Sequence, residues 1–415
     1  MYTEIKNCKL CKSTNLKLAL DLADLPIGDK YLPDNRKDES LKIYPLKIMM
    51  CEDCGNYQNS GFVDPKIIYN FYLSRPATTN PQLSGAYKEY ADILLKNYSN
   101  NKKDLKAYEA GSNDGTFIEY MQKSLGMKVL GIEPSPNLSK QANDRSVETI
   151  NDYFNSKLAT EIVKKHGQTD FFITNHTASN IVDFNDFIDG VKIILKDDGV
   201  FSLQTFYHKD VIEHNLIENF THEHLNYFYI KPLQSCLKNK GMEIFDIQLI
   251  PAKGGSFRAF IQKSNGPNRM QEIVSKIEKD EEDFGMNSIE IHERIKSFIS
   301  DIKSKLHQVI DQKNQEDKKI AAYGTSIGGT TFIFNYEIAR ALNFMVDDDP
   351  YRQGLLSPHF HIPVVSKEEI FKQKIDTIII LAPLYFDQIV KKNDEFVKQG
   401  GTFIKIWPKF EIVKE

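Results

Sequence analysis

The sequence predicts an α/β protein built from a small N-terminal metal-binding module followed by two Rossmann-like domains. Four of the five cysteines lie in the first 54 residues, arranged as two C-x2-C pairs. The stretch "LKAYEAGSNDGTFIEYM" (105–121) reads as a strand, a glycine turn and a helix, and "KKIAAYGTSIGGTTFIFNY" (318–336) repeats that pattern. Because strands that alternate with helices favour parallel sheets, each glycine turn should begin its own α/β domain.

Composition excludes several classes of protein. The chain has 415 residues, 41% of them hydrophobic, and a formal net charge of -4, which fits two or three packed domains. That charge gives no electrostatic case for binding nucleic acid or an anionic membrane. No run approaches the roughly 20 apolar residues of a membrane-spanning helix, and the N-terminus lacks an apolar signal-peptide core. We expect a cytoplasmic protein with reduced cysteines.

The segment 1–75 is predicted to be a zinc-binding domain. Cys8 and Cys11 are separated by 39 residues from Cys51 and Cys54. Two such pairs supply four thiolates to one tetrahedral ion, and a site with no open position is structural. Two chance pairs or a redox pair are the alternatives. Cys236 stands alone and reads as a helix-buried thiol.

The segment 76–265 carries a nucleoside-binding pattern. Its turn reads E-x-G-x-x-x-G, and the next strand ends in an acid, Glu133, 22 positions after Gly111. Glycines allow a backbone to approach a ligand closely, and an acid at that strand end can bind a ribose diol. The turn is bulkier than the NAD fingerprint, which suits a nucleoside without a pyrophosphate such as S-adenosylmethionine (SAM). A β–α turn without a ligand is the alternative. The predicted cofactor residues are Glu109, Gly111, Ser112, Asn113, Gly115, Glu133, Pro134 and Asn175.

The stretch "NFTHEHLNYF" (219–228) concentrates histidines, an acid and aromatics. If it were a strand, His222 and His224 would share one face at i, i+2 spacing. A catalytic metal site, an acid–base cluster and an ordinary strand all remain open, although a metal site lacks an obvious third ligand and an H-E-x-x-H helix.

The C-terminal third divides into a connector and a second nucleotide fold. Residues 266–317 are highly charged, with apolar residues at helical spacing, and predict amphipathic helices with a solvated charged face. Residues 318–415 predict a smaller Rossmann-like domain, with further strands at 344–350, 376–383 and 401–408. Its glycine turn, Gly324-x3-Gly328-Gly329, could bind phosphate or merely turn the chain.

Taken together, these motifs resemble the sugar C-methyltransferases, SAM-dependent enzymes of deoxysugar biosynthesis, over essentially the whole chain. The resemblance implies a central class I methyltransferase domain between the zinc-binding domain and a C-terminal domain that closes over the nucleotide. The matching pieces are the four N-terminal cysteines, "YEAGSNDGTFIEYM", "GIEPSPN", "INDYF" (150–154), "HEHLNYF" (222–228), "GGSFRAF" (254–260), "DDDPYRQG" (347–354), "IPVVS" (362–366) and "GGTFIKIWP".

The resemblance also implies a chemistry. A base removes the C3 proton of a nucleotide-linked 4-keto-6-deoxy sugar, and the resulting enolate takes the methyl group of SAM. The base falls on His224, with Glu223 to orient or polarise and Tyr72 of the linker reaching the sugar. The implied catalytic residues are His224, Glu223, Thr221 and Tyr72, and the implied substrate residues are His222, Asn226, Lys253, Arg258, Thr325 and Asp347. A monomer is compatible with this build.

Several positions depart from the family. Thr221 stands where the family commonly has a tyrosine, whose longer and more acidic hydroxyl would lie near the keto oxygen. Asn180, Gln204 and Lys253 replace a histidine, an acid and a histidine respectively. These departures leave open a SAM-dependent O- or N-methyltransferase, and also a non-catalytic binding module.

Overall fold

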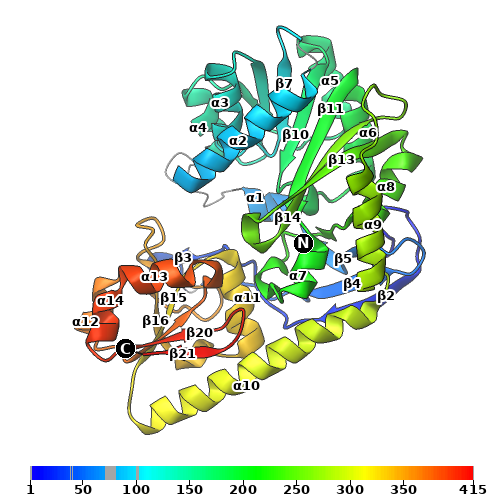
Figure 1. The fold of residues 1–415 in the computed structure, drawn as a ribbon. Helices are drawn as coiled ribbons and strands as arrows, with labels where there is room; N and C mark the ends of the chain where they lie inside the picture. The colour runs from blue at the N-terminus through cyan, green and yellow to red at the C-terminus, as the bar shows by residue number, and fades with distance from the viewer. Residues whose placement is uncertain (1, 38, 40, 71–80, 100–101, 415) are drawn as a thin grey trace.

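The structure is a computed structural model that describes residues 2–414 except 38, 40, 71–80, 100 and 101, and no side chain of residues 81–84. The linker tyrosine Tyr72 therefore lies outside the described residues. The chain forms three α/β parts and a helical connector (Figure 1), as the alternation of strands and helices predicts.

The largest sheet belongs to the middle part and has seven strands in the order β13-β14-β11-β10-β7-β8-β9. All neighbours are parallel except that β14 runs antiparallel between β11 and β13. The strands are β7 (Lys106–Ala110), β8 (Lys128–Ile132), β9 (Thr149–Ile150), β10 (Thr169–Asn175), β11 (Leu195–Phe206), β13 (Met242–Ile250) and β14 (Ser256–Lys263). Strand order reverses between β7 and β10, so a ligand crevice is expected at their carboxyl ends.

Helices cover both faces of this sheet. One face packs against α2 (Pro81–Tyr98), α3 (Thr116–Lys123) and α4 (Pro136–Asp144), the other against α5 (Ser156–His166), α6 (Phe184–Ile194) and α8 (Ile230–Asn239). The predicted helix and strand at 184–207 both form. The turn predicted between them is absent, because α6 leads directly into β11. Cys236 is buried in α8, as predicted.

The N-terminal part contains a four-stranded sheet in the order β12-β5-β4-β2. Three strands are local, β2 (Leu16–Asp21), β4 (Lys47–Cys51) and β5 (Tyr57–Asn59), but β12 (Asn226–Tyr227) comes from the middle part of the chain. The Asn59 side chain reinforces this junction: its amide donates to the Thr221 carbonyl at 3.0 Å, and its oxygen accepts from the Tyr227 hydroxyl at 3.1 Å. The segment His222–Glu223–His224, called the H-E-H segment below, is therefore tied to the N-terminal domain. Also here are β1 (Tyr2–Glu4), β6 (Gly61–Val63) and α1 (Pro65–Tyr69).

The C-terminal part is a smaller, mostly parallel sheet in the order β18-β16-β15-β19-β20-β21. Its strands are β15 (Ile320–Tyr323), β16 (Leu342–Val346), β18 (Val364–Val365), β19 (Thr377–Ile380), β20 (Thr402–Lys405) and the antiparallel β21 (Glu411–Val413), with helices α11 (Ile327–Tyr336), α12 (Glu368–Lys372), α13 (Phe386–Lys392) and α14 (Asp394–Lys398). It is joined to the N-terminal part by the pairing of β17 (Leu355–Leu356) with β3 (Leu32–Pro33), and by a buried ion pair of 2.6 Å between Arg352 and Asp29.

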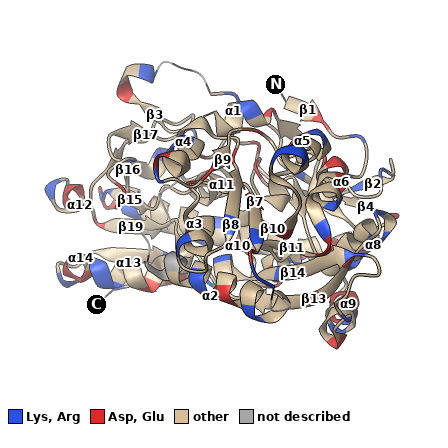
Figure 2. Cartoon of the chain, turned by 90° about the horizontal axis from the view of Figure 1, so that it is seen from above, with Lys and Arg blue, Asp and Glu red and all other residues tan. Residues whose placement is uncertain are grey.

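Two amphipathic helices connect the middle and C-terminal parts, α9 (Glu272–Phe284) and α10 (Glu293–Gln315), as predicted for this segment. In Figure 1, α10 runs along the lower edge of the molecule. Its buried residues, Ile295, Ile302, Leu306 and Ile310, fall on one face at helical spacing. Figure 2, in which the ribbon is coloured by residue type, shows Lys and Arg interspersed with Asp and Glu along the helices. Among the described residues, no helix is both long and apolar enough to cross a membrane.

Candidate active site

The four N-terminal cysteines converge. All four Sγ atoms lie within 4.8 Å of one another, with 3.6 Å between Cys8 and Cys54 and 3.5 Å between Cys11 and Cys51. A tetrahedral zinc ion with Zn–S bonds of about 2.3 Å places its sulfurs roughly 3.8 Å apart. The donor set and the spacing therefore fit a closed structural zinc site, as the sequence predicts.

A cleft of about 880 Å³ opens at the carboxyl ends of β7, β8 and β10, where the strand order reverses. Seven of the eight predicted cofactor residues line it: Glu109, Gly111, Ser112, Asn113, Glu133, Pro134 and Asn175. Gly115 instead forms the left-handed N-cap of α3, at φ 77°. Gly111 is also left-handed, at φ 72°, and a Cβ there would collide with the Thr177 side chain. The turn therefore needs glycine to hold its backbone against the cleft.

Two buried acids face the cofactor end of this cleft. Glu133 accepts from the backbone N–H groups of Asn113 at 2.8 Å and Ser135 at 2.9 Å, which fixes the glycine loop to the end of β8. Glu109 accepts from the Asn175 amide at 2.8 Å through Oε1. Its Oε2 is buried without a hydrogen-bond partner in the described part of the chain, and burial raises the pKa of Glu109 to about 8. Such an oxygen requires a donor, and the ammonium group of SAM is one, so the residues present fit this cofactor.

Next to Asn175 in the cleft lining, a chain of hydrogen bonds fixes the protonation of His176. Arg258 donates from Nε to Gln204 Oε1 at 2.6 Å, and Gln204 Nε2 lies 3.2 Å from His176 Nε2. Arginine has no acceptor, so Gln204 must present its oxygen to Arg258 and its amide to His176. His176 Nε2 therefore accepts, and its proton resides on Nδ1. Burial lowers the pKa of His176 well below its usual value, and the charge of Lys253 adds to this, so the ring is neutral.

His224 has the opposite tautomer. Its Nδ1–H donates to the Asn219 carbonyl at 2.6 Å, and the half-buried ring packs 4.6 Å from the Phe206 ring. Nε2 is thus an unprotonated nitrogen, and it makes no hydrogen bond within the described residues. Burial lowers the pKa of His224 to about 4, with a smaller contribution from Lys253, so the imidazole is a neutral base at physiological pH. Although His224 is not among the cleft-lining residues, it lies within electrostatic range of Lys253 and His176, which are.

Comparison with known proteins agrees with this arrangement. Three family models match consecutive parts of the chain: a zinc binding domain (residues 8–69), a methyltransferase domain (83–247) and a C-methyltransferase C-terminal domain (251–408). The chain is also similar to the C-methyltransferase NovU of Streptomyces niveus, with 22% identity over 99% of this chain and 97% of that protein.

The chain belongs to the C-methyltransferase family. It is a SAM-dependent methyltransferase with a structural zinc site, and its acceptor atom is carbon. Among solved structures it is similar to a SAM-dependent methyltransferase from Clostridium acetobutylicum (12% identity, 45% of this chain and 97% of that chain, TM-score 0.37) and to the plantazolicin methyltransferase BpumL (12% identity, 45% and 93%, TM-score 0.34).

Within this C-methyltransferase, the predicted acceptor residues separate into two groups. Lys253 and Arg258 line the cleft. The cleft lining does not include His222, Asn226, Thr325 or Asp347, whose polar groups contact other parts of the protein. Asn226 donates to the Ile181 carbonyl at 3.2 Å, and Thr325 donates its backbone N–H to Asp347 at 3.0 Å. Thr221 also lies outside the lining; its hydroxyl is buried and has no hydrogen-bond partner among the described groups.

The expectation that His222 and His224 share one face of a strand is wrong. The only strand here is Asn226–Tyr227, because β5, its pairing partner, ends at Asn59 and offers no further edge. The two rings diverge: His222 Nε2 lies 3.3 Å from the Tyr44 carbonyl, whereas His224 bonds to Asn219. In the described part of the chain, only the four cysteines form a cluster suited to a metal ion.

The C-terminal glycine turn serves close packing. Gly328 lies against Glu218, where a Cβ would collide with the Glu218 side chain, and Gly28 of the N-terminal domain packs against Ile327. The first turn of α11 is thus covered by two other segments, which favours the turn interpretation over a phosphate site. Thr331 strengthens the contact by donating to the Phe220 carbonyl at 3.1 Å.

Many other cleft-lining residues were not among the predicted site residues, and two of them, His176 and Tyr385, matter for the chemistry. His176 directly follows β10, and its position at a strand's carboxyl end was the available signal. Tyr385 follows β19 and is the C-terminal domain's contribution to the cleft lining, with 51% of its surface exposed. The sequence signal for Tyr385 was again its position after the end of a strand. Tertiary packing is what brings it to the methyltransferase cleft.

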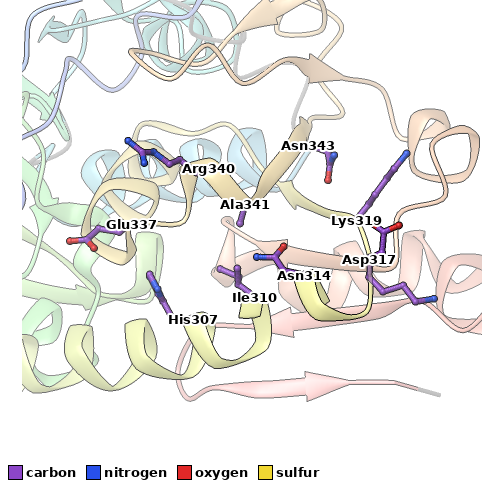
Figure 3. Close-up of a pocket in the computed structure, with 10 residues that line it drawn as sticks. His307, Ile310, Asn314, Asp317, Lys319, Glu337, Arg340, Ala341 and Asn343 are labelled. Carbon is purple, nitrogen blue, oxygen red and sulfur yellow. The ribbon is translucent and has the colours of Figure 1, made fainter. Parts of the chain in front are cut away.

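A second hollow, of about 510 Å³, lies between α10 and the C-terminal sheet (Figure 3). His307, Lys319, Glu337 and Arg340 are among its lining residues. Lys319 immediately precedes β15, so this hollow is at the amino end of that strand. Ligands of open α/β sheets bind at the opposite, carboxyl end, and we assign the active site to the larger cleft.

The role of Glu133 can be measured directly. Replacing Glu133 with alanine should weaken SAM binding by about 10- to 100-fold, the loss expected for hydrogen bonds to a charged acceptor worth about 1.5–3 kcal/mol. Isothermal titration calorimetry measures this. Glu148→Ala, which removes an exposed acid just before β9, is the matched control. Equal SAM affinity in Glu133→Ala and the unmodified enzyme would contradict the assignment.

Proposed function

We propose that this enzyme methylates C3 of a nucleotide-linked 4-keto-deoxysugar through an enolate. The observation that carries the proposal is the composition of one cleft, which the cofactor residues share with Lys253 and Tyr385. Its volume of about 880 Å³ is near the upper end of the roughly 300–1,000 Å³ typical of single-ligand sites, and it offers room for an acceptor beside the cofactor.

The residues at the acceptor end suit carbon deprotonation. A ketone acidifies the proton on the neighbouring carbon, and a neutral imidazole with a free nitrogen can remove it. His224 meets this requirement, since its tautomer leaves Nε2 unprotonated. Glu223, buried beside Lys253, supplies negative charge next to that cation. When bound, SAM supplies an electrophilic methyl group. Glu109, Glu133 and the glycine loop would hold the cofactor.

The C-terminal domain supports a nucleotide-linked acceptor. Tyr385 presents an exposed aromatic ring at the cleft, and such a ring offers a stacking surface for a nucleobase. The ion pair of Arg352 with Asp29 and the β3–β17 pairing hold this domain against the N-terminal domain. A substrate bound between the domains would therefore place its sugar in the cleft and its base against Tyr385.

Product analysis tests this function. Incubation with SAM carrying a ¹³C-labelled methyl group and a panel of nucleotide 4-keto-deoxysugars should yield a product heavier by one methyl-for-hydrogen exchange. Nuclear magnetic resonance should show the label bonded to a ring carbon. The control is the same sugars with the 4-keto group reduced to an alcohol, which should not react. Label bonded to oxygen or nitrogen, or equal turnover of the alcohol, would refute the proposal.

A further inference from the structure

We propose that Lys253 is a catalytic residue whose ammonium group binds the oxygen of the enolate. This inference rests on the proposed function and adds to it the group that carries the positive charge. The base alone is insufficient, because an enolate is stabilised by a donor placed where its negative charge develops.

Lys253 is the cleft cation that is free to meet a ligand. It lines the cleft, it is exposed to solvent, and it has neither an ion pair nor a hydrogen bond within the described residues. Arg258 also lines the cleft, but it is 4% exposed, bonded to Gln204 and Gln248, and stacked 4.0 Å over the Tyr90 ring. Lys66, on α1, also lines the cleft, but unlike Lys253 it does not contribute to the lowered pKa values of His176 and His224. Arg258 is thus committed to the protein, whereas Lys253 is not.

The backbone around Lys253 is held in an unfavourable conformation. Lys253 has φ 53° and ψ 32°, in the left-handed region that a lysine rarely adopts. The next two residues are Gly254 at φ 83° and Gly255 at φ 143°, and a Cβ at Gly255 would collide with Asp210. Left-handed non-glycine residues persist where the surrounding structure enforces them, and they cluster at active sites. This turn between β13 and β14 therefore keeps Lys253 at the cleft at a conformational cost.

The charges near Lys253 explain why this residue carries the positive charge and the two nearby imidazoles do not. Burial lowers the pKa of Lys253, and the negative charge of Glu223 opposes that shift. The same cation contributes to the lowered pKa values of His176 and His224, so neither imidazole carries a charge. The neutral base is thus accompanied by a cation that has no partner among the described residues, which is the pairing that enolate formation needs.

The step balances without a further reactant. The C3–H bond breaks, its proton forms an N–H bond at His224 Nε2, its electron pair forms the C3–C4 double bond, and the carbonyl π pair moves onto the C4 oxygen. Lys253 donates a hydrogen bond to that oxygen as its charge develops. Removing one donor of this kind typically costs about 10²- to 10³-fold in rate.

Two substitutions of Lys253 test whether its ammonium group binds the enolate oxygen. Lys253→Met should slow deuterium exchange from solvent into the substrate's C3 position, measured with S-adenosylhomocysteine in place of SAM, by about 10²-fold or more. It should also move the acid limb of kcat/KM to higher pH, because the charge that depresses the pKa of His224 is gone. Lys253→Arg should keep that limb near its original pH. The control is Lys263→Met at the far end of β14, where Lys263 pairs with Asp197 at 2.9 Å; it should leave both readouts unchanged.

The possible results distinguish a failure of the role of Lys253 from a failure of the proposed function. Unchanged exchange in Lys253→Met, or slower exchange with an unshifted acid limb, would overturn the catalytic role of Lys253 and leave the proposed function standing. Calorimetry of SAM binding distinguishes a folded variant from an unfolded one, and Lys253→Gln replaces Lys253→Met if the latter does not fold. No exchange by the unmodified enzyme with any 4-keto-deoxysugar would refute the proposed function, and the Lys253 assignment with it.

Discussion

Replacing His224 with asparagine should lower kcat for methyl transfer by about 10²- to 10⁴-fold, the contribution usual for a general base. The asparagine amide can still donate to the Asn219 carbonyl, as Nδ1–H of His224 does at 2.6 Å, so the loop should keep its shape. Its side chain has no basic nitrogen, so the proton acceptor is lost. Steady-state turnover with SAM and the accepted sugar measures the effect, and calorimetry should show unchanged SAM affinity.

The pH dependence gives a second signature of the same residue. The pKa of His224 is lowered to about 4, so its basic form appears as the pH rises through that value. In the unmodified enzyme kcat/KM should therefore rise through an acid limb near pH 4. His307→Asn, far from the cleft, is the control and should retain full turnover. Full turnover in His224→Asn would contradict the assignment of the base.

Removing the zinc ion should unfold the N-terminal domain and abolish activity together. Structural zinc sites contribute apparent binding free energies of about 10–16 kcal/mol, more than the stability of a typical domain. Cys51 ends β4, β4 pairs with β5, and β5 pairs with β12, which directly follows the H-E-H segment. Loss of the metal therefore releases the segment that carries His224. Metal analysis should find one zinc per chain, and chelation should lower the Tm and the turnover in parallel.

Two cysteine variants provide the comparison. Cys51→Ala removes one of the four thiolates and should lose zinc, whereas Cys236→Ala removes a buried thiol outside the cluster and should keep it. A Cys51→Ala protein with the zinc content and Tm of the unmodified enzyme would show that the cluster does not hold the metal.

Local signals predicted the cofactor half of the site well. The glycine turn, the acid at the end of β8 and Asn175 at the end of β10 are each read within one β–α unit, and all face the same cleft. The paired cysteines were equally informative, because their spacing already implies a shared ion. The order of the two α/β domains follows from the alternation of strands and helices in the same way.

The acceptor half could be read only in part, through the family resemblance that named Lys253 and Arg258, because distant segments build it. His176, Lys253 and Tyr385 come from β10, the β13–β14 turn and the C-terminal domain, and only tertiary packing unites them. The pairing of β12 with the N-terminal sheet is also long-range. The strand covers only Asn226–Tyr227 and does not reach His222, where a strand was considered. Thr221, which the family resemblance singled out, lies outside the cleft lining. Lys253, which also departs from the family pattern, does line the cleft.

Solvent deuterium exchange tests the central claim that a carbon acid is deprotonated in this cleft. The enzyme is incubated in deuterated water with the nucleotide 4-keto-deoxysugar and S-adenosylhomocysteine, so that no methyl group is available. The account predicts that deuterium enters C3 with the unmodified enzyme and that His224→Asn abolishes this exchange. Methylation of the same sugar without any exchange at C3, under conditions where the enzyme is active, would contradict it.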